Sequence, residues 1–268
     1  MKKISLLFFI IFLFGCEDVI QVDVESSKPQ IVIEARISNS LNNNFVKITE
    51  TTNYFNPNTY KVISGAEVKI KENNKAEYLL EETSAGIYQS HQLVAVPQNQ
   101  YSITVNVKGK KYAAESYVPS TINIDSITYQ IKKRPFKKEK FLELHVYFQD
   151  NKNQKDFARF VIYKNGERIK KIFLYDDRLT NGNYINYFFF NFDKETFKLG
   201  DKIFVEMQSI DEQTYKYFKT LRNATSQKVR GPVGAAAPAN PTTNWNNNAL
   251  GYFSAFTVST GSVILSKK

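Results

Sequence analysis

Side chains able to perform catalysis or bind a metal are few and scattered in this sequence. Its only histidines, His91 and His145, stand in no HxxxH or HExxH spacing, so a zinc site of the usual kind is not expected. The GxSxG, P-loop and GxGxxG patterns, which position a nucleophile or a phosphate, do not occur. We therefore predict no catalytic residues, no metal site and no cofactor, and expect that the protein is not an enzyme.

Acidic residues offer two weaker possibilities. The segment DNKNQKD carries Asp150 and Asp156 at a spacing that a calcium loop could use, but Lys152 occupies a position where such a loop needs an oxygen ligand. We interpret the segment as a hairpin turn. Asp176 and Asp177 are adjacent, and neighbours in a strand point to opposite faces, so they do not predict the carboxylate pair of a glycosidase.

One residue does stand where chemistry is expected. Cys16 is the only cysteine, and it follows two lysines and the apolar run from Ile4 to Phe14, which contains one serine. That run is shorter than the roughly 20 residues needed to span a bilayer, and it is typical of a secretory signal peptide. The ending Leu13-Phe14-Gly15-Cys16 resembles the lipobox of bacterial lipoproteins, whose cysteine thiol is acylated and becomes the new N-terminus.

This resemblance implies a lipoprotein signal peptide at residues 1–15 and attachment to membrane lipid through acylated Cys16. Anchoring by more than one acyl chain is stable, since each buried methylene contributes about 0.8 kcal/mol. The alternative is a buried cysteine in a membrane-anchoring helix. Residues 16–28 are acidic and polar with no structural period, and we expect a tether. Glu17 and Asp18 resemble a surface-export signal, although such acids favour inner-membrane retention in other bacteria.

The net charge limits the class of partner, and the cysteine content limits how the fold can be stabilised. The formal charge is +10; removal of residues 1–15 lowers the basic residues from 36 to 34 against 26 acidic ones, which leaves +8. A basic exported protein could bind lipopolysaccharide or another surface phosphate, but a lysine-rich composition explains the charge more simply, and no nucleic-acid partner is expected. A single cysteine cannot form an internal disulfide, so core packing must stabilise the fold.

Alternating strands are the main structural signal in the rest of the chain. From Pro29 to Pro119, short apolar–polar segments such as FVKITET and YSITVNV are separated by turns, which predicts a β-sandwich of transthyretin or immunoglobulin type over residues 29–119. The pattern restarts after Pro119 and predicts a second β-sandwich subdomain over residues 120–268. Asn165-Gly166 between two apolar segments indicates a tight hairpin. The fold class is therefore predicted to be mainly β.

One segment has helical spacing. Thr214, Tyr217, Phe218 and Leu221 recur at intervals of three and four residues, which predicts one short amphipathic helix near residues 210–223. Ser209 and Glu212 match the spacing of a capping box, so Ser209 is the expected N-cap.

Aromatic residues in loops are the candidate binding groups. Tyr54, Phe55 and Tyr60 lie in an Asn- and Pro-containing loop, and Trp245 lies in the long segment GPVGAAAPANPTTNWNNN. Exposed rings of this kind could stack on a glycan or fill a groove in a peptide or protein partner. Packing of the same rings onto their own domain is the equally open alternative.

Several segments together resemble a known family. They are PQIVIEARI, GAEV, GIY, YSI, YVPSTINIDSITY and, most specifically, NWNNNALGYFSAFTV near the end. In this order they resemble a domain-of-unknown-function family of outer-membrane lipoproteins of Gram-negative bacteria that accompany TonB-dependent receptors. The resemblance covers essentially the whole chain. It implies a lipid-anchored, cell-surface-exposed outer-membrane protein, but no catalytic residue.

Two functional hypotheses follow. The first is a non-enzymatic accessory of a TonB-dependent receptor in nutrient capture or uptake. The alternative is a structural or assembly lipoprotein of the envelope, which binds other proteins without a small ligand.

Overall fold

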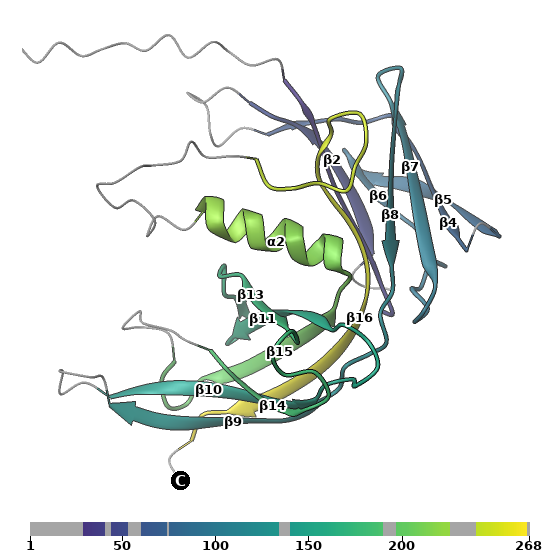
Figure 1. Cartoon of the computed structure of the whole chain (residues 1–268). Coiled ribbons are helices and arrows are strands. Elements are labelled where there is room, and N and C mark those ends of the chain that lie inside the picture. The colour runs from purple at the N-terminus through teal and green to yellow at the C-terminus, as the bar shows by residue number, and fades with distance from the viewer. Residues whose placement is uncertain are drawn as a thin grey trace, which may run out of the picture.

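The computed structural model describes residues 29–40, 44–52, 60–73, 75–133, 140–189, 197–225 and 240–266. Over these residues the chain is mainly β with a single helix, and its sheets pack as β-sandwiches, which confirms the predicted fold class (Figure 1). None of the helical structure described is both long and apolar enough to cross a bilayer.

The first eight strands lie before residue 120. They are β1 (Ile31–Ser38), β2 (Phe45–Glu50), β3 (Lys61–Val62), β4 (Glu67–Glu72), β5 (Ala76–Ser84), β6 (Ile87–Gln89), β7 (Gln100–Val107) and β8 (Lys110–Tyr117). The remaining elements are β9 (Ile124–Lys133), β10 (Lys140–Gln149), β11 (Phe157–Lys164), β12 (Glu167–Arg168), β13 (Phe173–Asp176), β14 (Tyr184–Phe188), β15 (Lys202–Ser209), α2 (Glu212–Thr225) and β16 (Leu250–Ile264).

The long strand β16 joins the two halves of the molecule (Figure 1). Its first part pairs in parallel with β1, from Val32↔Leu250 to Ser38↔Phe256. Its second part pairs antiparallel with β15, from Ser209↔Thr257 to Lys202↔Ile264. The large sheet therefore runs without a break in the order β12-β11-β15-β16-β1-β2-β6-β5-β4-β7-β8.

This shared strand changes the predicted division into domains. The chain does leave the first sandwich between β8 and β9, close to the expected boundary at residues 119 and 120. Residues 29–119 nevertheless do not complete that sandwich, because the segment from Trp245 to Ala255 supplies part of its core. Each half is thus built from segments that are far apart in the sequence.

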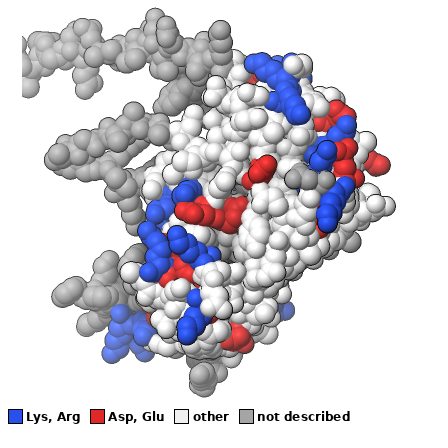
Figure 2. Space-filling view, turned by 45° about the vertical axis from the view of Figure 1, so that its right-hand side comes forward, with Lys and Arg blue, Asp and Glu red and all other residues white. Residues whose placement is uncertain are grey.

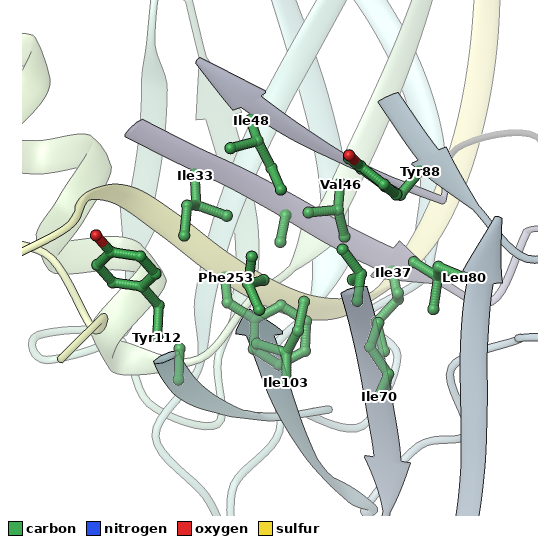
Figure 3. Close-up of a cluster of buried hydrophobic side chains, with 14 of the residues drawn as sticks. Ile33, Ile37, Val46, Ile48, Ile70, Leu80, Tyr88, Ile103, Tyr112 and Phe253 are labelled. Carbon is green, nitrogen blue, oxygen red and sulfur yellow. The ribbon is translucent and has the colours of Figure 1, made fainter. Parts of the chain in front are cut away.

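The first core forms where alternate residues of the strands point inward. Ile33 of β1, Ile103 of β7 and Phe253 of β16 are almost fully buried. Figure 3 shows the three side chains converging from different strands, with Phe253 reaching across toward Ile103. Burial of a large apolar side chain contributes about 1.5–3 kcal/mol, so β16 supplies part of the stability of the N-terminal half.

The second half has layers on both faces of the sheet. On one face, the three-stranded sheet β14-β10-β9 packs on β11 and β15, and buries Val146 and Phe148 against Phe160 and Val205. On the opposite face lies α2, whose Tyr217 and Phe218 pack with Tyr252 of β16. The helix reaches along only part of this outer face, in contact with β11, β13 and the middle of β16.

The helix begins two residues later than the sequence pattern indicated. Asp211 is the N-cap, and its Oδ1 accepts a hydrogen bond of 2.7 Å from the backbone N–H of Thr214. The predicted cap Ser209 is wrong, because Ser209 is the last residue of β15 and its hydroxyl accepts a hydrogen bond from the N–H of Ile122. The other carboxylate oxygen of Asp211 accepts from Ser116 and Tyr117 of β8, so this cap also ties the helix to the first sandwich.

Candidate functional site

A groove lies on the part of the outer face that α2 leaves open. Its volume is about 750 Å³ and it is open to solvent. Residues of β11, β15, β16 and the β11–β12 turn line it: Tyr163, Gly166, Lys202, Ile203, Phe204, Glu206, Ser262, Val263 and Ile264. Binding pockets for small ligands have volumes of about 300–1,000 Å³, so the groove is of a size to hold a ligand.

Strand alternation and register place an aromatic pair in this groove. On β15, Val205 is buried in the second core, whereas Phe204 faces outward and is 39% exposed. Phe204 pairs with Tyr163 on one side and with Ser262 on the other. The rings of Tyr163 and Phe204 lie 5.9 Å apart between centroids and are tilted by 54°. They form an apolar floor, with a hydroxyl group beside it.

The predicted Asn165-Gly166 hairpin builds one end of the groove. Both residues have positive φ, at 52° and 86°, which is the backbone geometry that a two-residue turn of this type requires. The side chain of Asn165 accepts a hydrogen bond from the N–H of Lys202 and donates one to Asp201, each of 2.8 Å. These bonds fix the turn against the start of β15, and thereby position Lys202 at the rim.

The chemistry of the groove is that of recognition. Its floor offers two aromatic rings and the exposed Ile264, while Lys202, Glu206 and Ser262 supply a cation, an anion and a hydroxyl at its sides. A ligand with an apolar face and polar edges, such as a sugar ring or an extended peptide, matches this arrangement. The sequence pattern did not identify this site, since strand alternation places Phe204 and Glu206 on one face but does not say which face α2 leaves uncovered.

Most of the residues predicted as sites fall elsewhere. Cys16, Glu17, Asp18, Tyr54 and Phe55 lie outside the described residues. Tyr60, which precedes β3 on the first sandwich, is 69% exposed, and the Nζ of Lys47 lies 5.7 Å from the centroid of its ring. Tyr60 is therefore accessible to a partner, but it does not line the groove.

Trp245 is not a surface contact. Its side chain is 5% exposed in the first core, and its indole Nε1–H donates a hydrogen bond of 3.1 Å to the carbonyl oxygen of Ile33. The contact prediction is thus wrong for Trp245, and the alternative, packing onto its own domain, holds. The reason is that the segment around it is clamped between β8 and β16, which turns the ring inward.

The asparagines of NWNNN explain this clamp. Asn246 exchanges two hydrogen bonds with the backbone of Ala113 in β8, one through its side chain and one through its N–H. The side chains of Asn244 and Asn247 donate to the carbonyl oxygens of Glu115 and Lys111 in the same strand. The NWNNN segment thus covers the edge of β8. This motif, which is the most specific part of the family resemblance, therefore has a structural role.

Buried carboxylates elsewhere are held by the fold itself. Asp150 accepts hydrogen bonds from the hydroxyl of Tyr175 and the N–H of Gly182. Asp156 accepts from the N–H of Asn151 and the side chain of Gln154. The hairpin prediction for this segment is wrong, because β10 and β11 on either side of it lie in different sheets, so these bonds hold a connection between sheets. Among the described residues, no group of three or more His, Cys, Asp and Glu side chains is arranged to hold a metal ion.

His145 is also committed to the fold. It is buried on β10, with Nδ1 2.8 Å from the amide oxygen of Asn186 and Nε2 3.0 Å from Oε1 of Glu143. Only Nδ1 has a hydrogen-bond partner, since the contact of the buried Nε2 with Glu143 lacks hydrogen-bond geometry, so His145 is a buried strand histidine that is satisfied on one side.

Surface charge is mixed on the face in Figure 2. Basic and acidic side chains lie close together in small groups there, and wide uncharged areas separate the groups. Among the described side chains on this face, the basic residues form no continuous surface of the kind that binds a nucleic-acid backbone.

The family assignment follows from a comparison with known protein families. A family model described as "Domain of unknown function (DUF4249)" matches residues 17–262. The chain belongs to this family. The DUF4249 match covers every described strand of both halves except the last residues of β16, so the shared-strand architecture falls within the family domain. No curated protein matches the chain.

Proposed function

We propose that this DUF4249 protein is a non-enzymatic binding protein, anchored in the outer membrane by acylated Cys16, that assists a TonB-dependent receptor in nutrient capture or uptake. The observation that carries the binding role is the open aromatic groove of Tyr163 and Phe204, on the part of the outer face that α2 leaves uncovered. A glycan or a peptide is the proposed ligand class. The lipobox-like ending at Cys16 supports the anchor, and the family resemblance supports the receptor.

The anchor is tested by Cys16→Ser. Without the thiol no acyl chain can be attached, so the variant should leave the membrane fraction, while wild-type protein stays in it until detergent is added. Metabolic labelling with a fatty acid should mark the wild type alone. A variant that remains in membranes unlabelled would contradict lipid anchoring. Accessibility of the wild type to a membrane-impermeant biotin reagent on intact cells tests surface exposure.

Substitutions in the groove test the proposed partnership with a receptor and the proposed ligand. Phe204→Ala and Tyr163→Ala remove the aromatic floor, and Tyr184→Ala is the matched control, because Tyr184 is an exposed strand tyrosine on β14, outside the groove. After cross-linking in cells, wild type and control should recover a TonB-dependent receptor. The groove variants should lower uptake of its substrate, or binding of a glycan or peptide from a panel. Recovery of no such receptor would refute the accessory role.

The structural or assembly role remains the second proposal, because the groove is open enough to receive side chains of a partner protein. In that case Phe204→Ala should reduce recovery of the partner protein, while no glycan or peptide of the panel binds the wild type.

A further inference from the structure

Three polar side chains lie buried together between α2 and the sheet. They are Arg159 of β11, Tyr217 of α2 and Tyr252 of β16, which are only 7%, 9% and 9% exposed. The rings of Tyr217 and Tyr252 lie 4.6 Å apart between centroids. The guanidinium carbon of Arg159 lies 3.9 Å from the centroid of Phe218, which itself packs on Tyr252 at 5.0 Å.

The hydrogen-bonding capacity of this cluster is largely unused. Arg159 has five N–H donors, and its one hydrogen bond to a described residue joins Nη1 to Oε1 of Gln208 at 3.3 Å. No carboxylate among the described residues forms an ion pair with it. The hydroxyls of Tyr217 and Tyr252 likewise bond to no described residue.

The electrostatics of the cluster favour a negative ligand. Burial raises the pKa of both tyrosine hydroxyls, which therefore remain protonated donors at neutral pH. Burial lowers the pKa of Arg159, yet a guanidinium stays charged in proteins. Arg36 and Arg168 add positive charge at longer range, and Glu34 and Glu206 add negative charge.

A buried cation without a counter-charge is costly, because its hydration is lost and nothing replaces it. Glu206 and Glu34 act on Arg159 and the two tyrosines through space, but among the described residues neither forms an ion pair or a hydrogen bond with Arg159. An oxyanion supplies the kind of acceptor that these groups lack, since its charged oxygens accept strong hydrogen bonds from a guanidinium and from tyrosine hydroxyls.

We propose that Arg159, Tyr217 and Tyr252 bind an oxyanion, namely a carboxylate or phosphate group of a ligand. This site lies under α2, apart from the groove lined by Tyr163 and Phe204, and it does not depend on the receptor proposal. Failure of either one leaves the other standing.

The test measures thermal unfolding of purified protein in sodium phosphate, sodium acetate and sodium chloride at equal ionic strength. Phosphate also stabilises proteins generally, so the comparison between variants decides. Arg159→Met removes the charge, and Tyr217→Phe with Tyr252→Phe removes only two hydroxyls. Tyr184→Phe is the control, since it removes an exposed hydroxyl from β14, outside both sites.

In the wild type and in Tyr184→Phe, phosphate or acetate should raise Tm saturably above its value in chloride, by the amount that ligand linkage predicts. Arg159→Met and the double variant should bind the anion about tenfold more weakly or worse, as expected for lost hydrogen bonds to a charged group. A gain in phosphate alone identifies a phosphate group, and a gain in acetate alone a carboxylate. Equal Tm values in the three salts, or equal gains in all variants, would overturn the proposal.

Discussion

Asp156 gives the sharpest test of the structure, because it is 1% exposed and adjacent to other acids. Its carboxylate accepts hydrogen bonds from the N–H of Asn151 and from Nε2 of Gln154, and its own N–H donates to Asp177. Asp156→Asn keeps the shape and removes the charge. The amide oxygen can still accept from Asn151, and rotation of the Gln154 amide lets its oxygen accept from the new NH₂ group.

Burial raises the pKa of Asp156 to about 6 from 3.8; the hydrogen bonds from Asn151 and Gln154 oppose this shift, and weaker repulsion from Asp150 and Asp177 adds to it. A raised pKa means that the folded state binds the proton more tightly than the unfolded state does. The carboxyl group therefore favours folding below pH 4, and this contribution is lost as the pH rises to 6 and above. Two pKa units correspond to a change of about 3 kcal/mol in the free energy of unfolding.

The assay is urea denaturation between pH 3.5 and 7.5, followed by the fluorescence of Trp245, which is the only tryptophan, and by circular dichroism. Relative to the wild type, Asp156→Asn should become more stable by up to about 3 kcal/mol as the pH rises through this range. The control Asp125→Asn changes an exposed acid on β9 and should show no such trend. If the difference between wild type and Asp156→Asn stays constant with pH, the assignment of a buried, repelled carboxyl group is refuted.

Two further substitutions test the contact of β16 with β1 and the contact of α2 with β8. Gly251→Ala should lower the free energy of unfolding by at least about 4 kcal/mol or prevent folding, because φ is +95° and the new Cβ would clash with the carbonyl oxygen of Ile33. Its control is Gly109→Ala, where φ is +70° but no atom lies within 4 Å of the new Cβ. This control should cost only about 1 kcal/mol in the same urea assay. Asp211→Ala should cost about 1–2 kcal/mol, because α2 loses its N-cap and Ser116 its acceptor, whereas Glu212→Ala should change stability by less than about 0.5 kcal/mol. Equal losses within either pair would contradict the assigned contact.

Features that depend on local spacing were predictable from the sequence. The alternation in FVKITE reports which residues of β2 face the core, because the period of a strand is two wherever it lies. The turn at Asn165-Gly166 follows from the ability of these two residue types to adopt positive φ. The helical spacing of Tyr217 and Phe218 likewise indicated the face of α2 that packs on the sheet.

Features that depend on pairing between distant segments were not predictable from the sequence. Trp245 follows an Asn- and Pro-rich segment typical of a surface loop, and only contacts with β1 and β8 turn it inward. The cap at Asp211 rather than Ser209 is decided by where β15 stops pairing with β16. The groove around Phe204 exists because α2 covers one part of the outer face and not the rest, and no periodicity in β15 reports the reach of a helix.

The shared strand β16 also sets the order in which the molecule can be completed. Trp245 and Ile33, which are bonded in the first core, are 212 residues apart in the chain. When β1 leaves the ribosome, β16, which is one of its two neighbours in the finished sheet, has not yet been synthesised. Contacts of such long separation form slowly, because a large loop must close before they can stabilise anything. The core of the N-terminal half can therefore be completed only when nearly the whole chain has been synthesised.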